Sequence, residues 1–379
     1  MTAVARPIDG YPPIVVLFGG PSAEHDVSIV SGTAIAAGLR TLGLTVGQVL
    51  VDLEGQWWWL PPGHLRDDHP PADYDDPAAF GAEGPLTVGT ALDRLAHAAP
   101  RPLVFVALHG PFGEDGTVQA LLESIEVPYT GAGITASALG MDKALFKRLA
   151  RGLGLPVADW REIPAVRWPA ERDGVLAELE AFASAGNDPR LMIKPARLGS
   201  SLGMSIAHHA GERAASLEEA FRFDTLVLAE RYLPHARELE VAVLGNDGQP
   251  IEDYGPGEVV SSHEFYDYAA KYTPGLSDTS PHAELAGPER AMIRKIARDA
   301  YRAVGAEGFA RVDFLFSAGH IYLSEINTIP GFTPTSLFPA VAADGGYDFA
   351  GVCRRIIDLA IQRHESRISR RLTADDLPR

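Results

Sequence analysis

A continuous apolar run near the start of the chain, Ile14 to Phe18, is closed by the pair Gly19-Gly20. Uninterrupted apolar residues of this length are typical of a strand that is buried on both faces, as in a parallel sheet. A second strand is expected at residues 46–51, and a helix that begins near His25 lies between the two. This helix has apolar residues at helical spacing, namely Val27, Val30, Ala34 and Ala37. A β-α-β opening of this kind predicts an α/β fold.

Length and charge narrow the class of protein further. The chain has 379 residues, which predicts two or three domains. Its formal net charge of −17 argues against non-specific binding to nucleic acid, because a phosphate backbone requires a basic surface. Cys353 is the only cysteine, so neither an intrachain disulfide nor a cysteine-rich zinc site is expected. We see no apolar run long enough to span a membrane and no secretory signal pattern, and therefore expect a cytoplasmic protein.

Apolar periodicity predicts further elements along the chain. Strands are expected at 103–108, 191–194, 226–230, 238–244, 311–316 and 321–327, and helices at 117–124, 142–151, 175–184, 288–304 and 349–365. The helix at 142–151 has Leu145, Leu149 and Leu153 on one face. Residues 159–170 are interpreted as a connection, and 54–100 as a long surface excursion with one helix near 92–98. Within that excursion, Trp57 to Trp59 form either a partly packed strand or a platform on which a ligand stacks.

The strongest chemical signal lies in the two strands nearest the carboxyl terminus. Because side chains alternate along a strand, Arg311, Asp313 and Leu315 share one face. Glu325 and Asn327 share a face of the partner strand. Paired strands lie about 4.8 Å apart, so two carboxylates, an amide oxygen and a guanidinium can converge on one patch. Hard oxygen donors in this number suit Mg²⁺. The alternative is a surface ladder of charged residues paired with Arg311.

Two further segments are candidate phosphate and lid loops. Loop 199–203 follows a strand that ends at Lys194, and its glycines and serines leave backbone N–H groups available for phosphate oxygens. Gly203 is followed by Met204, so the loop is not a Walker A motif, and a plain flexible turn is the alternative. The polar segment 261–280 is interpreted as a lid that closes on a charged ligand, or as a disordered flap. It contains Tyr266, Tyr268, Lys271 and Tyr272.

Polar residues also follow two strands of the first half of the chain. Ser22 and Glu24 come after the first strand, where open α/β sheets bind ligands. Glu24 could hold an amine, whereas capping of the helix by Ser22 is the alternative. His109 ends another strand and is either a ligand-binding or a structural histidine. Residues 131–136 have glycines spaced as in a weak dinucleotide motif, but no acidic residue ends a second strand at the expected distance, so nicotinamide binding is not favoured.

In this order, the segments resemble the D-alanine–D-alanine ligases of the ATP-grasp superfamily. The resemblance covers nearly all of residues 14–360, and the ordered set is far more specific than any single motif. The matching motifs are Leu17 to Ser28, His109 to Gly116, Met141 to Lys143, Lys194-Pro195, Gly199 to Ser201, Tyr266 to Tyr272, Arg311 to Phe314 and Glu325 to Thr333.

The resemblance implies a fold and a reaction. The fold combines α/β and α+β parts: an N-terminal Rossmann-like substrate-binding domain at 1–131, a central ATP-grasp lobe at 132–230, and a C-terminal lobe with lid and metal site at 231–379. The reaction joins two D-alanine molecules with ATP, through an acyl phosphate, to give D-alanyl-D-alanine, ADP and phosphate for peptidoglycan precursors. The resemblance also implies a homodimer.

The resemblance further implies a role for individual residues. Those matching catalytic positions are Glu24, Ser200, Tyr272, Arg311 and Gly331, of which Glu24, Ser200 and Tyr272 form a trio that latches the lid. Substrate-binding positions are Val27, His109, Ser336 and Leu337. ATP-binding positions are Lys143, Lys194, Ser201, Glu230, Arg231, Leu233, Glu238, Lys271 and Leu315. Asp313, Glu325 and Asn327 match the ligands of two Mg²⁺ or Mn²⁺ ions.

The chain departs from the family pattern in two places. Arg231 stands where many members have a lysine beside adenine, and residues 54–100 match no motif of the family. Tyr272, in place of a lid histidine, favours an amine over a hydroxy acid as the second substrate. A ligase for another small amino acid in a specialised pathway is the nearest alternative. A nucleotide-binding regulator without catalysis is disfavoured, because Lys194, Arg311 and the other motif residues are intact.

Overall fold

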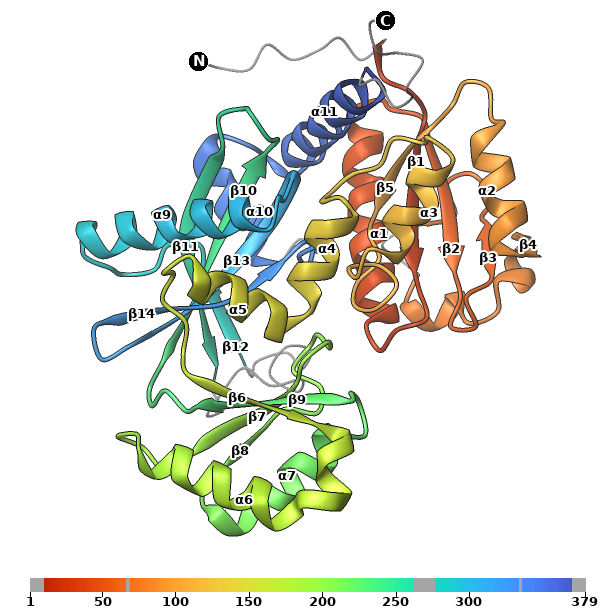
Figure 1. Cartoon of the computed structure of the whole chain (residues 1–379). Coiled ribbons are helices and arrows are strands. Elements are labelled where there is room, and N and C mark those ends of the chain that lie inside the picture. Colours follow the sequence, from red (N-terminus) through yellow and green to blue (C-terminus); the bar gives the residue numbers. More distant parts are fainter. Residues whose placement is uncertain (1–9, 66–68, 262–276, 334–335, 370–379) are drawn as a thin grey trace, which may run out of the picture.

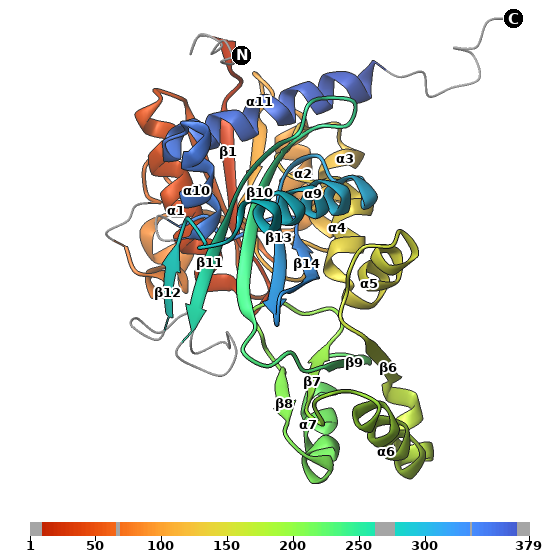
Figure 2. The same cartoon turned by 90° about the vertical axis from the view of Figure 1, so that its left-hand side faces the viewer.

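The computed structural model describes residues 10–65, 69–261, 277–333 and 336–369. It contains three sheets, which follow one another along the chain. In Figure 1 the N-terminal sheet lies on the right, a large antiparallel sheet lies on the left and a small sheet lies below it. Figure 2 shows the small sheet projecting from the rest of the molecule. None of the helices in the described ranges is both long and apolar enough to cross a bilayer.

The N-terminal sheet has the strand order β4-β3-β2-β1-β5. The strands are β1 (Ile14–Gly19), β2 (Val46–Val51), β3 (Trp57–Trp59), β4 (Glu83–Leu86) and β5 (Leu103–Val106). β1 runs parallel to β2 and β5, and all of its residues are buried, which confirms the predicted α/β opening. β3 pairs antiparallel with β2, so the tryptophan run is the partly packed strand of the two alternatives.

Helix α1 (His25–Thr41) begins at the predicted residue but packs by a different face than its apolar spacing suggests. Its buried residues include Ile29, Ile35, Ala36 and Leu39, whereas Val30 is 40% exposed. The expected stripe of Val27, Val30, Ala34 and Ala37 is therefore not the face that packs on the sheet. Small and apolar residues occur around the whole helix, so spacing alone could not distinguish the two faces. Helices α2 (Val88–Ala96) and α3 (Thr117–Ser124) complete this part of the fold.

The large sheet is antiparallel, in the order β12-β11-β10-β13-β14. Its strands are β10 (Arg237–Gly245), β11 (Glu252–Ser261), β12 (Ser277–Ser280), β13 (Gly308–Ser317) and β14 (His320–Asn327). Helix α9 (Gly287–Ala303) packs against Leu239, Val241 and Val243 on one face. Helices α10 (Leu337–Ala342) and α11 (Phe349–Ile368) pack on the other face. The interpretation of 261–280 as loop throughout is wrong at its ends, because β11 includes Ser261 and residues 277–280 form an edge strand.

The small sheet has the order β6-β9-β7-β8. Its strands are β6 (Trp160–Pro164), β7 (Leu191–Pro195), β8 (Ser205–Ala207) and β9 (Leu226–Arg231), and helices α6 (Trp168–Ser184) and α7 (Arg213–Ala220) cover one face. The interpretation of 159–170 as a connection is wrong, since β6 pairs with β9 along its whole length and α6 begins at Trp168. Two adjacent charged residues, Arg161 and Glu162, interrupt the apolar/polar alternation of β6, and this masks its strand pattern.

Helices α4 (Ile134–Met141) and α5 (Lys143–Gly152) lie between the large and the small sheet. On α5, Phe146 and Ala150 join the core of the large sheet. Of the predicted leucine face, Leu149 packs partly against this core, but Leu145 is 43% exposed and Leu153 is 58% exposed. Lys143 and Lys147 are buried instead, Lys143 against Glu325 of the large sheet and Lys147 against Glu230 of the small sheet.

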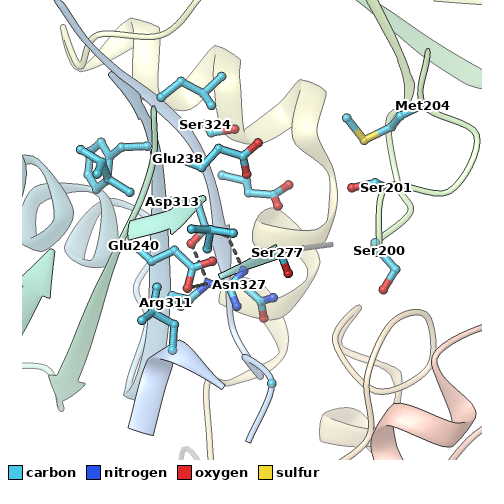
Figure 3. A pocket seen from close by; sticks show the side chains of 18 of the residues that line it. Ser200, Ser201, Met204, Glu238, Glu240, Ser277, Arg311, Asp313, Ser324 and Asn327 are labelled. Carbon is cyan, nitrogen blue, oxygen red and sulfur yellow. Dashed lines mark hydrogen bonds and ion pairs between the residues drawn. The ribbon is translucent and has the colours of Figure 1, made fainter. Parts of the chain in front are cut away.

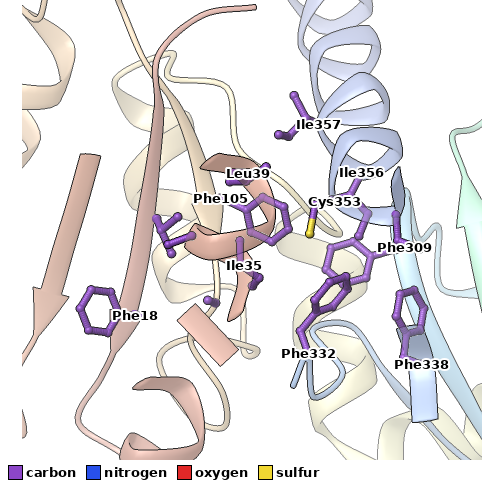
Figure 4. Packing of buried hydrophobic residues seen from close by; sticks show 14 of the residues in the cluster. Phe18, Ile35, Leu39, Phe105, Phe309, Phe332, Phe338, Cys353, Ile356 and Ile357 are labelled. Atoms are coloured by element: carbon purple, nitrogen blue, oxygen red, sulfur yellow. The ribbon is translucent and has the colours of Figure 1, made fainter. Parts of the chain in front are cut away.

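One hydrophobic cluster joins the N-terminal sheet to the large sheet (Figure 4). Phe105 of β5 and Ile35 of α1 pack with Cys353 and Ile356 of α11, and Phe309 of β13 packs on the same cluster. Apolar side chains from three parts of the sequence therefore fill one space, and α11 lies between two sheets. The divisions 1–131, 132–230 and 231–379 are compatible with this arrangement and remain a prediction.

Candidate active site

A cavity of about 1050 Å³ opens between the end of the large sheet, the small sheet and the start of α1. Every predicted site residue that the structure describes lines this cavity. These residues are Glu24, Val27, His109, Lys143, Lys194, Ser200, Ser201, Glu230, Arg231, Leu233, Glu238, Arg311, Asp313, Leu315, Glu325, Asn327, Gly331, Ser336 and Leu337. The remaining two, Lys271 and Tyr272, lie outside the described residues, as do Tyr266 and Tyr268 of the expected lid.

The hairpin of β13 and β14 brings its polar residues together as the alternation predicted. Asp313 pairs with Glu325, and Arg311 pairs with Asn327. Nε and Nη2 of Arg311 each donate to Asp313, both at 2.7 Å, and Nε lies 3.3 Å from Oε2 of Glu240 on β10. Figure 3 shows Glu240, Arg311, Asp313 and Asn327 grouped together, with Ser200 and Ser201 on the opposite side of the cavity. The cluster lies inside the cavity, so it is not a surface ladder.

Charge pairing dominates the electrostatics of this cluster. Burial opposes the charge of Arg311, but Asp313 and Glu240 outweigh it and raise the pKa of the guanidinium well above its usual value. Nζ of Lys143 lies 3.0 Å from Oε2 of Glu325. Burial likewise opposes the charge of Lys143, and Glu325 outweighs it, so that the pKa of Lys143 is raised. The acidic hairpin is thus held by fixed cations on two sides.

The donor set of the hairpin fits a hard divalent cation. Asp313 and Glu325 supply carboxylate oxygens, and Asn327 supplies an amide oxygen that accepts from the N–H of Ile329 at 3.2 Å. Oxygen donors of this type are those that Mg²⁺ and Mn²⁺ prefer. Among the described residues no three His, Cys, Asp or Glu side chains form a metal-binding group.

Loop 199–203 connects β7 to β8 on the far side of the cavity. Ser200 and Ser201 both have positive φ, 51° and 56°, a conformation that is uncommon for residues other than glycine. The hydroxyl of Ser200 donates to Oε1 of Glu24. The loop therefore makes a specific hydrogen bond to Glu24, at the start of α1, and is not a plain flexible turn.

Glu24 is enclosed by backbone on two sides. A Cβ on Gly110 would lie 2.5 Å from Oε2 of Glu24, and a Cβ on Gly199 would lie 2.9 Å from the same atom. The alternative prediction, that Ser22 caps helix α1, is wrong, because α1 has no side-chain cap. Its hydroxyl donates to the carbonyl of His109 at 2.8 Å and accepts from the N–H of Glu24 at 3.2 Å. Ser22 thus fixes the turn that carries Glu24.

His109 has a partner at each ring nitrogen. Nδ1 lies 3.0 Å from the carbonyl oxygen of Ile329, and Nε2 lies 2.8 Å from Oγ of Ser31. A carbonyl can only accept, so Nδ1 carries the proton and Nε2 accepts from the hydroxyl of Ser31. Oγ of Ser31 in turn accepts from the N–H of Phe332 at 3.3 Å. This chain of hydrogen bonds holds the loop at Ile329 and at Phe332, on both sides of Gly331. Burial lowers the pKa of His109.

Glu114 holds the same loop; the sequence placed it within the motif His109 to Gly116 but indicated no role for it. Its Oε2 accepts from the N–H of Gly110 at 2.7 Å, and its Oε1 accepts from the N–H of Ile329 at 3.2 Å. Burial, together with the charge of Glu24, raises the pKa of Glu114 to about 8. Ser31, Lys147 and Glu240 were also missed, because each lies in an element whose pattern indicates only packing.

Because side chains alternate along β9, Glu230 and Arg231 lie on opposite faces of the strand. Oε1 of Glu230 lies 2.8 Å from Nζ of Lys194 on β7. Arg231 faces the opposite side of the strand, where its guanidinium lies 4.4 Å from the ring centroid of Phe182 on α6. Nε of Arg231 also lies 3.7 Å from Asp159. The arginine borders the cavity, but its charge points toward α6.

The sheet order, the acidic hairpin and the two lysines around one cavity are those of an ATP-grasp protein. Family models described as the N-terminus and C-terminus of D-ala D-ala ligase match residues 13–132 and 149–358. Curated D-alanine–D-alanine ligases of Heliobacterium modesticaldum and Kineococcus radiotolerans are 36% and 38% identical to this chain. They cover 97% and 93% of it, and 98% and 97% of their own lengths. The chain belongs to the D-alanine–D-alanine ligase family.

Solved structures show the same fold. The D-alanine-D-alanine ligase of Coxiella burnetii has a TM-score of 0.73 at 28% identity, over 94% of this chain and 97% of its own. The VanG D-Ala:D-Ser ligase of Enterococcus faecalis has a TM-score of 0.76 at 29% identity, over 92% and 99%. The ATP-grasp fold predicted from the motifs is confirmed.

Proposed function

We propose that this chain joins two D-alanine molecules with ATP, giving D-alanyl-D-alanine, ADP and phosphate for peptidoglycan precursors. A carboxylate is a poor electrophile, so the γ-phosphoryl group of ATP is first transferred to the carboxylate of one D-alanine. The amine of the second D-alanine attacks the resulting acyl phosphate, and phosphate leaves from the tetrahedral intermediate. The observation that carries the proposal is that Glu24, the two lysines Lys143 and Lys194, and the acidic hairpin all line one cavity.

One end of the cavity binds ATP, and the other end binds the amino acids. Lys143 and Lys194, with the N–H groups of the loop at Ser201, bind the phosphates, and Lys271 is assigned to the phosphoryl group in transfer. Glu230, Arg231, Leu233, Glu238 and Leu315 surround the nucleoside. Asp313, Glu325 and Asn327 would hold two Mg²⁺ or Mn²⁺ ions, which when bound offset the negative charge of the transferring phosphoryl group.

The other end of the cavity receives the amino acids. Glu24 binds the ammonium of the first D-alanine, supported by Ser200 and the close backbone of Gly110. Val27 and His109 border this site. Ser336 and Leu337 bind the carboxylate of the second D-alanine, and Tyr272 completes the latch of the lid.

Arg311 and the N–H of Gly331 stabilise the oxyanion that forms when the amine attacks. The chain of hydrogen bonds through Ser31, His109 and Ile329 keeps the Gly331 loop in place for this task. A donor that is fixed before the reaction needs no reorganisation in the transition state, and removing one such donor typically costs about 10²–10³ in rate.

The purified chain tests the proposal directly. With D-alanine, ATP and MgCl₂ we expect ADP, phosphate and D-alanyl-D-alanine in equal amounts, measured by coupled phosphate release and by chromatography of the dipeptide. L-Alanine serves as the control substrate and should give no dipeptide. Phosphate release without a dipeptide product would contradict the proposal.

D-Alanyl-D-serine synthesis is a second candidate, because the VanG neighbour is named for that product. Competition between D-alanine and D-serine as second substrate separates the two: predominant D-alanyl-D-alanine at equal concentrations supports the first proposal. We also propose a cytoplasmic homodimer, as the family resemblance implies, and light scattering of the purified chain would test the dimer.

A further inference from the structure

Lys147 is a buried cation that the proposed mechanism does not use. It follows Lys143 by one turn of α5, and Lys143 lines the cavity whereas Lys147 does not. The side chain of Lys147 is 1% exposed, and its Nζ lies 3.1 Å from Oε1 of Glu230. An ammonium buried to this extent requires a specific reason, because its desolvation is costly.

Glu230 shares one carboxylate oxygen between two lysines. Its Oε1 lies 3.1 Å from Nζ of Lys147 and 2.8 Å from Nζ of Lys194. Lys147 reaches this oxygen from α5, and Lys194 reaches it from the neighbouring strand β7. All three side chains are at most 6% exposed. The cluster therefore has two lysines for one carboxylate; Glu230 and Lys194 border the cavity, whereas Lys147 lies behind them.

Pairing decides the ionisation of this cluster. Burial tends to raise the pKa of Glu230, but the ammonium groups of Lys147 and Lys194 outweigh burial and hold that pKa below its ordinary value. A buried carboxylate needs one cation to balance it, and removing the partner of a buried charge is strongly unfavourable. Lys147 can supply the one cation that Glu230 needs, so Glu230 does not also require Lys194.

We propose that Lys147 is a positioning residue for the nucleotide: it balances Glu230 so that Lys194 can leave the carboxylate for the phosphates of ATP. The inference rests on the proposed function, in which Lys194 binds phosphate and Glu230 faces the nucleoside. Without Lys147, movement of Lys194 to a phosphate would leave Glu230 buried without a counter-charge. Lys194 would then stay with Glu230, and the nucleotide would bind less tightly.

The variant Lys147→Met removes the charge and keeps a similar side-chain length. We expect the Kd for ADP, measured by calorimetry, and the KM for ATP to rise about tenfold, the size of coupling found between charges in contact. The KM for D-alanine and kcat at saturating ATP should stay within about twofold, because Lys147 touches neither substrate. Arg148→Met is the matched control: it removes the neighbouring cation of α5, whose side chain is 58% exposed, and should leave all four constants unchanged.

A double variant tests whether Lys147 acts through Glu230. In a Glu230→Gln background no buried carboxylate remains to be balanced, so adding Lys147→Met should change the Kd for ADP by less than about twofold. A tenfold loss that persists in this background would overturn the inference. Lys147→Gln keeps a hydrogen-bond donor toward Glu230 without the charge. It provides a second test should Lys147→Met fail to fold, with the same tenfold loss expected.

Lys194→Met separates failure of this inference from failure of the proposed function. Lys194→Met should itself weaken ADP binding, because a phosphate ligand is lost. If Lys194→Met weakens ADP binding and Lys147→Met does not, the positioning role of Lys147 is wrong and the phosphate site stands. If neither variant changes the Kd, the assignment of Lys194 to the phosphates is wrong, and the inference falls with it.

Discussion

Nδ1 of His109 donates to the carbonyl of Ile329, a residue 220 positions further along the chain, over 3.0 Å. The bond links the end of β5 in the N-terminal sheet to the loop that follows β14 in the large sheet. Two residues beyond Ile329 lies Gly331, whose N–H we assign to the oxyanion. A contact between two distant parts of the chain thus sets the position of a reacting group.

This relationship makes stability depend on pH. Burial lowers the pKa of His109 from 6.5, so below about pH 6.5 the unfolded chain takes up a proton that the native chain does not. The native state therefore loses stability as the pH falls through this range. His109→Asn keeps a donor near the Nδ1 position and should cost about 1–2 kcal/mol at pH 7.5. The difference from the native chain should shrink at pH 5.5 in urea unfolding, and a constant difference would contradict the protonation argument.

Gly199→Ala should weaken binding of the first D-alanine. The added Cβ would lie 2.9 Å from Oε2 of Glu24, so the carboxylate must shift away from its place beside Gly110. We expect the KM for D-alanine to rise about tenfold, since small displacements of a positioning group have large effects. Gly152→Ala, where a Cβ meets no atom within 4 Å, is the control and should leave the kinetics unchanged. An unaltered D-alanine KM in Gly199→Ala would remove Glu24 from this role.

Glu325→Gln should lower turnover by about 10² or more, because a neutral amide binds a divalent cation weakly and metal ions supply several kcal/mol to such transition states. The residual rate should require a higher concentration of MgCl₂ for half-maximal activity. Glu284→Gln, which removes an exposed carboxylate outside the cavity, is the comparison variant. Near-native turnover with an unchanged magnesium requirement in Glu325→Gln would refute the metal assignment.

Cys353 should be unreactive in the folded protein. The thiol lies on α11 in the cluster that this helix shares with α1 and is fully buried, and burial raises its pKa, so almost no thiolate is available. A thiol reagent should modify nothing in buffer and one group per chain in denaturant. Cys353→Ser places a hydroxyl in the apolar cluster and should cost about 1–3 kcal/mol in urea unfolding, whereas modification in buffer would mean that α11 opens.

Local sequence patterns predicted strands such as β1, β13 and β14. The apolar run of β1 and the alternation in β13 and β14 indicated both the strands and the face that carries Asp313 and Glu325, and the register confirmed it. These predictions succeeded because alternation follows from the backbone itself. The faces of α1 and α5 could not be predicted in the same way, since each helix contacts more than one neighbour.

The motifs of this sequence were enough to predict the ATP-grasp fold, the acidic hairpin and the residues that line the cavity, because those side chains lie within short segments of regular geometry. Only the tertiary structure decided that Lys147 and Lys194 share Glu230, and that Ser31, His109 and Glu114 hold the loop at Gly331. Such pairings join elements that are remote in sequence. Their partners are selected by the packing of α5 and α11 against the sheets, which no local pattern encodes.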